Sequence, residues 1–298
     1  MKFTKMHGIG NDYIYVNGFE EHIEDPSKAA VILSDRHTGI GSDGLILINP
    51  SQVADFEMEM YNADGSRGKM CGNGIRCVAK YVYDHGMTDG RTTITVETLG
   101  GIKTLEITVK DGKAVRVRVD MGAPIFTPEE IPVLVCRTGD AKTASYPKEK
   151  EVEGIGRMVK NRYMTLPDGT QMRGTCVSMG NPHCVVEVED VASFEVEKIG
   201  RMFETLDIFP DRINTEFIHV DDRKNVTMRV WERGSGETMA CGTGACAVAA
   251  SCIVNGLTDD QVTIHLLGGD LEIEWDREKN TIFMTGPAAM VFEGEVEI

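Results

Sequence analysis

The chain has 298 residues, of which 41% are hydrophobic and 26% charged, and its formal net charge is −16. This composition is typical of a globular protein with one large domain or two ordinary ones. The negative charge argues against a nucleic-acid partner, which needs clustered Lys and Arg, and no apolar run is long enough for a membrane span. Because the first ten residues, MKFTKMHGIG, lack the apolar core of a signal peptide, a cytoplasmic protein is expected.

In chain order, the first glycine-rich motif is GIGSDG, in which Gly39, Gly41 and Gly44 satisfy the pattern GxGxxG. A dinucleotide-binding fingerprint needs a strand before this motif and a helix after it. Here a helix-like run, SKAAVILSDR, precedes the motif, and a strand-like run, LILI, follows it. The order is inverted, so we exclude a dinucleotide-binding site of this kind.

The next motif, MCGNGIRCVA (Met70–Ala79), recurs 170 residues later as ACGTGACAVA (Ala240–Ala249). Because glycine commonly follows a helix end, Gly86 and Gly256 predict one helix after each motif. Four landmarks at one offset indicate two homologous halves. The other matched pairs are Asn11 with Asn181, Tyr61 with Trp231, and Gly86 with Gly256.

Short segments with alternating apolar and polar residues, such as FEMEMY, VRVRVD, VTMRVW and LEIEW, predict strands between Gly, Asp and Asn turns. With one helix per half, the pattern predicts an α+β fold. We expect two pseudo-symmetric domains, each a mostly antiparallel β-sheet or barrel wrapped around a central helix. The stretch Cys136–Arg173 is rich in Lys, Glu, Gly and Pro and has no dense counterpart in the first half, so it is expected on the surface.

Each repeated motif puts a cysteine, Cys71 or Cys241, at or just before a helix N-terminus. The uncovered amide groups and the helix dipole there favour an anion and lower the pKa of a thiol. Two such turns facing each other across a cleft suit inversion of a carbon stereocentre. One thiolate removes the α-proton and the opposite thiol delivers another, with the sulfurs roughly 7 Å apart.

The remaining six cysteines are predicted to be structural and reduced. The chain is long and lacks CxxC, CxxH and HxxxH spacings, which argues against a disulfide framework and against a zinc site. The residues concerned are Cys77, Cys136, Cys176, Cys184, Cys246 and Cys252.

Several polar residues near strand ends have two interpretations, one structural and one functional. Asparagines at these positions are either turn residues or substrate ligands. Glu232 and Arg233 are either a surface ion pair or ligands for the charged far end of a substrate, and His183 is either a solvated turn residue or a group that tunes a thiol. The asparagines are Asn11, Asn62, Asn181 and Asn214.

Five segments together resemble the diaminopimelate epimerase family over essentially the whole chain. The resemblance implies a fold of two similar domains with the site between them. It implies interconversion of LL- and meso-2,6-diaminopimelate, for lysine and peptidoglycan synthesis, without pyridoxal phosphate or metal. Since the last strand of the family pairs back onto the first domain, we expect domains of 1–121 plus 287–298 and of 122–286. The five segments are HGIGNDYI, MYNADGSRGKMCGNGIRC, GNPHCV, RINTEF and WERGSGETMACGTGACA.

The resemblance also implies roles for individual residues. Cys71 and Cys241 look like the two acid–base thiols, with Cys241 deprotonating the LL substrate and Cys71 protonating it. His183 and Glu232 resemble groups that tune the thiols. The implied substrate ligands are Asn11, Asn62, Gly72, Asn73, Asn181, Asn214, Glu232, Arg233, Gly242 and Thr243.

The chain departs from the family at two positions. Gly44 stands where many members have a glutamine ligand, so that side-chain contact is missing. Phe292 stands where some members use a tyrosine in a dimer contact, so a homodimer with an apolar contact there is expected.

Three alternatives stay open from the sequence. A racemase for proline or hydroxyproline would use the same paired thiols, but a ring amino acid has no second centre to occupy Asn62, Asn214 and Arg233. A thiol redox protein would need cysteines within disulfide reach, and a pure binding module would tolerate loss of both thiols.

Overall fold

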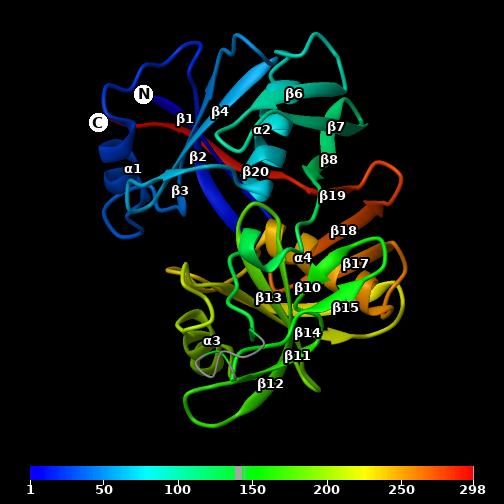
Figure 1. Cartoon of the computed structure of the whole chain (residues 1–298). Coiled ribbons are helices and arrows are strands. Elements are labelled where there is room, and N and C mark those ends of the chain that lie inside the picture. Colours follow the sequence, from blue (N-terminus) through cyan, green and yellow to red (C-terminus); the bar gives the residue numbers. More distant parts are fainter. Residues whose placement is uncertain (138–142, 144, 298) are drawn as a thin grey trace. The chain divides into compact units, whose positions relative to one another are not determined.

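The computed structural model describes residues 1–137, 143 and 145–297, which form two compact units. Unit 1 comprises Met1–Asp120 with Thr285–Ile298, and unit 2 comprises Met121–Met284. In Figure 1 unit 1 runs from blue to cyan and includes the red C-terminal strand. No helix among the described residues is long and apolar enough to cross a membrane.

Unit 1 holds two helices and most of the N-terminal strands. Its elements are β1 (Lys2–Gly8), β2 (Asn11–Asn17), α1 (Pro26–Ser34), β3 (Gly44–Asn49), β4 (Phe56–Asn62), β5 (Arg67–Gly68), α2 (Gly72–Asp84), β6 (Thr93–Glu97), β7 (Lys103–Lys110), β8 (Lys113–Gly122) and, at the C-terminus, β20 (Ala289–Glu295).

Unit 2 begins with a short 3₁₀ helix, η1 (Pro128–Glu130), and three additional strands, after which its elements follow the order of unit 1. Its elements are β9 (Lys150–Val152), β10 (Gly156–Met158), β11 (Arg162–Thr165), β12 (Gln171–Ser178), β13 (Pro182–Glu187), α3 (Val196–Glu204), β14 (Asn214–Val220), β15 (Asn225–Glu232), β16 (Gly236–Thr238), α4 (Gly242–Asn255), β17 (Gln261–Leu266), β18 (Gly269–Asp276) and β19 (Thr281–Pro287).

The 170-residue repeat is a repeat of structure. Helices α1 and α3 both have nine residues and begin at Pro26 and Val196, and α2 and α4 begin at Gly72 and Gly242. Most strand pairs are antiparallel. The parallel pairs occur at matched places, β2–β3 and β4–β6 in unit 1 and β13–β14 and β15–β17 in unit 2.

Each unit encloses one helix. Helix α2 contacts β1, β2, β7 and β20, and α4 contacts β12, β13, β14, β17 and β18, so both helices are buried on most sides. Figure 1 shows α2 among the strands of unit 1. Helix α4 has small and apolar side chains around its whole circumference, so it has no face suited to water. Helix α2 also carries Arg76 and Lys80, whose polar atoms are hydrogen-bonded within unit 1. The predicted α+β class is confirmed.

Both central helices end as predicted. Gly256 caps α4 in the left-handed conformation, with φ +76°, and Gly86 has φ +74° just after α2. Glycine adopts this conformation without steric strain, so each chain leaves its helix sharply.

The prediction that Cys136–Arg173 lies on the surface is wrong for residues 158–166. Met158, Val159, Met164 and Leu166 are at most 2% exposed, and the last three join a core cluster of unit 2. Strand β11 pairs with β12, and its buried Met164 lies between the exposed Tyr163 and Thr165, so the neighbours in sequence mask an apolar face. Residues 138–142 and 144 of this stretch lie outside the described residues.

The C-terminal strand returns to the beginning of the chain. Strand β20 pairs antiparallel with β1, from Lys2 opposite Glu295 to His7 opposite Ala289. The edge of Phe292 packs against Phe3, with ring centroids 5.9 Å apart. The last strand is therefore part of the sheet of unit 1.

Candidate active site

The two repeated cysteines occupy the same position in their helices. Cys71 is the N-cap of α2 and Cys241 is the N-cap of α4, both with extended backbone. The Cys71 Sγ accepts a hydrogen bond from the Gly74 amide at 3.3 Å, and the Cys241 Sγ accepts one from the Gly244 amide at 3.4 Å. Each sulfur therefore lies where amide groups and the helix dipole stabilise a negative charge.

In unit 1 the Cys71 thiol meets the predicted ligand Asn11. The Cys71 Sγ donates to the Asn11 Oδ1 at 3.2 Å, and the Asn11 Nδ2 donates to Asp43 at 2.7 Å. The neighbouring Tyr13 is 5% exposed, and burial, followed by the charge of Cys71, raises the pKa of its hydroxyl well above the usual value. Tyr13 therefore stays neutral beside the thiol.

A charged network holds Asn11 in this orientation, and the sequence analysis did not identify it. Asp43 also accepts from the Asp12 amide at 3.1 Å and pairs with Arg36 at 2.9 Å. Burial opposes ionisation of Asp12, but hydrogen bonds from Arg36 and Lys5 outweigh it and lower the pKa of Asp12. In the sequence, Asp43 could have been singled out because it lies inside GIGSDG, the motif that resembles a dinucleotide fingerprint.

In unit 2 the Cys241 thiol lies at the end of a chain of hydrogen bonds. The Cys241 Sγ is 3.6 Å from the Thr243 Oγ1, which accepts from the Asn181 Nδ2 at 3.2 Å. The Asn181 Oδ1 is 3.0 Å from the His183 Nε2. Unit 2 therefore brings four predicted site residues into direct contact.

His183 is neither solvated nor in a turn. Its ring is fully buried in β13, and its Nδ1 is 2.7 Å from the Oε1 of Glu216, which is also fully buried. Glu216 was missed by the sequence analysis. In the sequence, Glu216 could have been singled out as a charged residue inside NTEFI, a run otherwise suited to a buried strand. This run forms the start of β14.

At Cys241, burial and two nearby carboxylates outweigh the stabilisation by the helix N-terminus and disfavour a thiolate. Burial, followed by the charges of Glu232 and Glu216, raises the pKa of the Cys241 thiol well above its usual value. Burial also raises the pKa of Glu232, which accepts from the Thr238 hydroxyl at 2.5 Å. A thiolate formed here is a strong base, and Glu232 is a neighbour able to take the thiol proton.

The backbone at the start of each helix is the predicted carboxylate cradle. In α2 the Asn73 Oδ1 accepts from Arg76 at 2.8 Å, and Arg76, which is fully buried, also donates to the Gly72 carbonyl at 3.1 Å. In α4 the Thr243 side chain bonds Asn181 beside Gly242. The side chains of Asn73 and Thr243 are hydrogen-bonded to other protein side chains. Any anion-binding character therefore comes from the backbone amides at the helix N-termini.

The residues predicted to bind the far end of a substrate lie at matched strand ends. The Asn214 Oδ1 accepts from the Arg233 amide at 2.9 Å, and the Arg233 side chain donates to the Asp211 carbonyl at 2.8 Å. In unit 1 Asn62 donates to Ser66 at 2.9 Å. Glu232 and Arg233 do not form the surface ion pair that was the alternative.

Gly44, the register mate of Asn214, leaves no room for a side chain. It lies opposite Asn62 in the β3–β4 pair, and a Cβ there would lie 2.1 Å from the Tyr61 carbonyl oxygen. A glutamine, as in many family members, needs a different local backbone.

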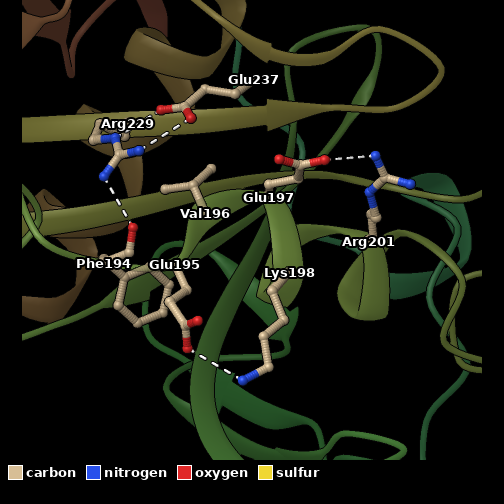
Figure 2. A pocket seen from close by; sticks show the side chains of 8 residues that line it. All are labelled: Phe194, Glu195, Val196, Glu197, Lys198, Arg201, Arg229 and Glu237. Atoms are coloured by element: carbon tan, nitrogen blue, oxygen red, sulfur yellow. Dashed lines mark hydrogen bonds and ion pairs between the residues drawn. The ribbon is translucent and has the colours of Figure 1, made fainter.

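A surface pocket of unit 2 lies beside the N-terminus of α3, and Figure 2 shows its lining. None of the predicted site residues lines it. Among the described residues, no group of three or more His, Cys, Asp or Glu side chains is arranged to hold a metal ion. The charged side chains of the pocket are paired with one another: Glu195 with Lys198, Glu197 with Arg201, and Arg229 with Glu237.

Known proteins match the chain over its whole length. The family model described as diaminopimelate epimerase matches residues 3–127 and 175–291. A diaminopimelate epimerase from Agathobacter rectalis is 57% identical over 100% of both chains. One from Acetivibrio thermocellus is 55% identical over 100% of this chain and 99% of its own. One from Methanococcus maripaludis is 53% identical over 100% of both chains.

Solved structures share the fold at much lower identity. A PhzF-family phenazine biosynthesis protein from Bacillus anthracis is 18% identical, with a TM-score of 0.68 over 100% of this chain and 99% of its own. A probable proline racemase from Agrobacterium radiobacter is 14% identical, with a TM-score of 0.64 over 100% of this chain and 93% of its own. At these identities the likeness concerns the fold alone.

Proposed function

Because the chain belongs to the diaminopimelate epimerase family, we propose that it interconverts LL- and meso-2,6-diaminopimelate with two cysteines, and without pyridoxal phosphate or metal. The observation that carries this proposal is the pair of N-cap cysteines, Cys71 and Cys241, at matched positions of two buried helices. The reaction belongs to the synthesis of lysine and of peptidoglycan precursors.

The chemistry is a proton exchange between opposite faces of one carbon. The thiolate of one cysteine takes the α-proton, and the C–H electron pair stays on the carbon. The thiol of the other cysteine then delivers a proton to the opposite face, which inverts the centre. In the LL direction Cys241 is the base and Cys71 the acid, and the roles exchange in the reverse direction.

This mechanism needs the two thiols on opposite sides of the substrate. We propose two domains, 1–121 plus 287–298 and 122–286, whose cysteine turns face each other across a cleft. With each sulfur about 3.5 Å from the reacting carbon, the sulfurs are separated by roughly 7 Å. A disulfide cannot form across that distance while substrate is bound.

The reacting carboxylate binds the amides that follow each cysteine, at Gly72-Asn73 and Gly242-Thr243, where helix dipoles favour an anion. Asn11 and Asn181 lie beside the thiols, and His183 and Glu232 tune Cys241. The contacts of Asn11 and Asn181 with Cys71 and Thr243 support these roles. Asn62, Asn214, Glu232 and Arg233 bind the distal amino acid centre.

We also propose a cytoplasmic homodimer. Two thiols that must stay reduced suit a reducing compartment. The apolar residues Met290, Val291 and Phe292 of β20 are 52%, 55% and 45% exposed, which supports contact with a second copy of the chain.

Proton NMR of LL-diaminopimelate in D2O, with reductant and no added cofactor, tests the function. We expect loss of the α-proton signal and formation of the meso isomer. Cys71→Ala and Cys241→Ala should each lower the epimerisation rate by about 10³-fold or more. Folded, reduced protein that leaves diaminopimelate unchanged but racemises proline or hydroxyproline would overturn the substrate assignment.

A further inference from the structure

We infer that Glu216 is a positioning residue that prepares Cys241 to act as the base, through His183, Asn181 and Thr243. This inference rests on the proposed function and adds a residue to it. Glu216 does not touch the thiol in a hydrogen bond. It acts by fixing which atoms of its neighbours donate and which accept.

The fold itself does not require a carboxylate at this position. Glu216 is fully buried, and its Oε2 has no hydrogen-bond partner among the described residues. Its register mate in unit 1 is Ile46, in the same place of strand β3. A Cβ on Gly244 would lie 2.8 Å from the Glu216 Oε1, and a Cβ on Gly74 would lie 2.8 Å from the Ile46 Cδ1. In unit 1 the apolar side chain of Ile46 therefore fills the space that Glu216 fills in unit 2. The buried, unpaired Oε2 of Glu216 is energetically unfavourable, so packing alone does not explain a glutamate here.

Glu216 determines whether the Nε2 of His183, the ring nitrogen that faces Asn181, carries a hydrogen. The Nδ1 is 2.7 Å from the Glu216 Oε1, and the Nε2 is 3.0 Å from the Asn181 Oδ1. With its Nδ2 on Thr243, Asn181 presents its Oδ1 to the ring, and because this oxygen can only accept, the Nε2 carries a hydrogen. The Nδ1 and Glu216 then share a second proton, either as a carboxylic acid beside a neutral ring or as a carboxylate beside a doubly protonated ring. A carboxylate beside a neutral ring with its hydrogen on Nδ1 does not fit this orientation of Asn181. Glu216 thus holds His183 as a donor toward Asn181.

This donor fixes the amide of Asn181, and the amide fixes the hydroxyl of Thr243. With its Oδ1 toward His183, Asn181 presents its Nδ2 to the Thr243 Oγ1 at 3.2 Å. The Nδ2 can only donate, so the hydroxyl hydrogen of Thr243 is left for the Cys241 Sγ at 3.6 Å. The chain of bonds therefore ends in a donor aimed at the sulfur, which stabilises the thiolate when it forms.

Glu216→Gln removes the preference for a hydrogen on the Nε2 of His183. The new amide can accept from a protonated Nδ1 or donate to an unprotonated one, so both ring tautomers are allowed. When the Nε2 lacks its hydrogen, Asn181 turns its Nδ2 toward His183 and the Thr243 hydroxyl bonds Asn181 instead of Cys241. The loss falls on steps in which Cys241 is the base and leaves Cys71 as a base intact.

Fluoride release from the stereoisomers of 3-fluoro-2,6-diaminopimelate separates the two bases. A thiolate takes the α-proton, the C–H electron pair forms the C=C bond, and fluoride leaves. The enamine then tautomerises and hydrolyses to a keto acid and ammonium. One base is sufficient, so Cys71→Ala identifies the isomer that Cys241 deprotonates, and Cys241→Ala identifies the other.

For the isomer assigned to Cys241, Glu216→Gln should slow fluoride release by roughly 10- to 100-fold, the factor for losing a hydrogen bond to a charged atom. For the other isomer, the rate should stay within about twofold, because sites without shared partners act independently. Glu195→Gln, an exposed carboxylate paired with Lys198, is the matched control. If Glu216→Gln does not fold, Thr243→Val tests the last link, with a larger loss expected for the isomer assigned to Cys241 than for the other isomer.

Equal loss with both isomers, or no loss, overturns the role of Glu216 while the epimerase stands. No fluoride release by the wild type with either isomer overturns the proposed function, and this inference falls with it. Nitrogen-15 NMR of the histidine rings gives an independent readout. We expect a protonated Nε2 on His183 in the wild type, and an unprotonated Nε2 there contradicts the inference.

Discussion

Residues 170 positions apart occupy matched places but differ in chemistry. Beside Cys71, Tyr13 contributes a neutral hydroxyl, whereas its register mate His183 contributes a titratable ring in the unit of Cys241. Behind them, Ile46 in unit 1 stands where Glu216 stands in unit 2. The two thiols therefore share a helix position but not an electrostatic environment, which suits two bases that act on different stereoisomers.

The glycines three residues after the cysteines give a matched pair of substitutions. Alanine alone favours a helix over glycine by up to about 1 kcal/mol. In Gly244→Ala the new Cβ lies 2.8 Å from Glu216 and 3.2 Å from the Cys241 Sγ, whereas in Gly74→Ala it meets the flexible ends of Ile46 and Met58. We expect kcat to fall about 100-fold for Gly244→Ala, because small displacements of reacting groups are costly.

Gly74→Ala is the control, and its kcat should stay within about tenfold of the wild type. Steady-state kinetics of both variants, with circular dichroism to establish folding, measure the difference. A larger loss in Gly74→Ala than in Gly244→Ala contradicts the argument.

Helices α1 and α3 show how equivalent elements are attached differently. Glu204, the last residue of α3, accepts from the Trp231 indole at 2.7 Å and from the Gly234 amide at 3.1 Å. This ties α3 to the turn that carries Glu232 and Arg233. In α1 the mate of Glu204 is Ser34, which accepts a hydrogen bond from Ser42 at 3.0 Å. Unit 2 therefore anchors the turn after β15 with a buried charge.

The attachment of α3 predicts a pH-dependent stability. Burial opposes ionisation of Glu204, but hydrogen bonds from Trp231, Arg212 and the Gly234 amide outweigh it and lower the pKa of Glu204 below 4.5. A lowered pKa stabilises the fold above the unfolded value of 4.5, and this contribution is lost as the pH falls through the native pKa. Glu204→Gln should therefore lower the free energy of unfolding by about 1.5–3 kcal/mol at neutral pH.

Urea unfolding at neutral pH and near pH 3 measures this effect. The difference between Glu204→Gln and wild type should shrink at the lower pH. Ser34→Ala, which loses a neutral hydrogen bond of about 1 kcal/mol, should show the same difference at both pH values. A pH-independent effect of Glu204→Gln is incompatible with the assigned ionisation.

At the scale of the whole molecule, the net charge of −16 repels copies of the chain, so association needs an apolar surface. Phe292 is 45% exposed on β20 although its edge packs against Phe3. Burying the exposed part of such residues supplies association energy of about 25 cal/mol per Å². The C-terminal strand is where we propose that two copies meet.

Phe292→Asp should convert the proposed dimer to a monomer, because a buried unpaired carboxylate strongly disfavours the interface. Light scattering after size-exclusion chromatography measures the mass. Val53→Asp, at an apolar residue that is 64% exposed in unit 1, is the control and should remain dimeric. A monomeric wild type, or an unchanged mass for Phe292→Asp, removes this proposal.

The sequence by itself determined the family, the α+β class and the internal repeat. Helix and strand signals are local, and glycine after a helix or alternation along a strand is readable without knowing what the segment packs against. The N-cap positions of Cys71 and Cys241 follow from the same local rules. The individual site residues remain predictions from the resemblance.

Only the tertiary structure decided what surrounds those residues. Glu216 meets His183 because β13 and β14 lie in parallel register, with His183 opposite Asn214, and Asp43 reaches Asn11 across more than 30 residues of chain. The core residues within 136–173 were hidden because each of them has polar or charged neighbours in the sequence. Burial and side-chain pairing are non-local, so a segment read alone shows which groups are present but not which of them share a proton.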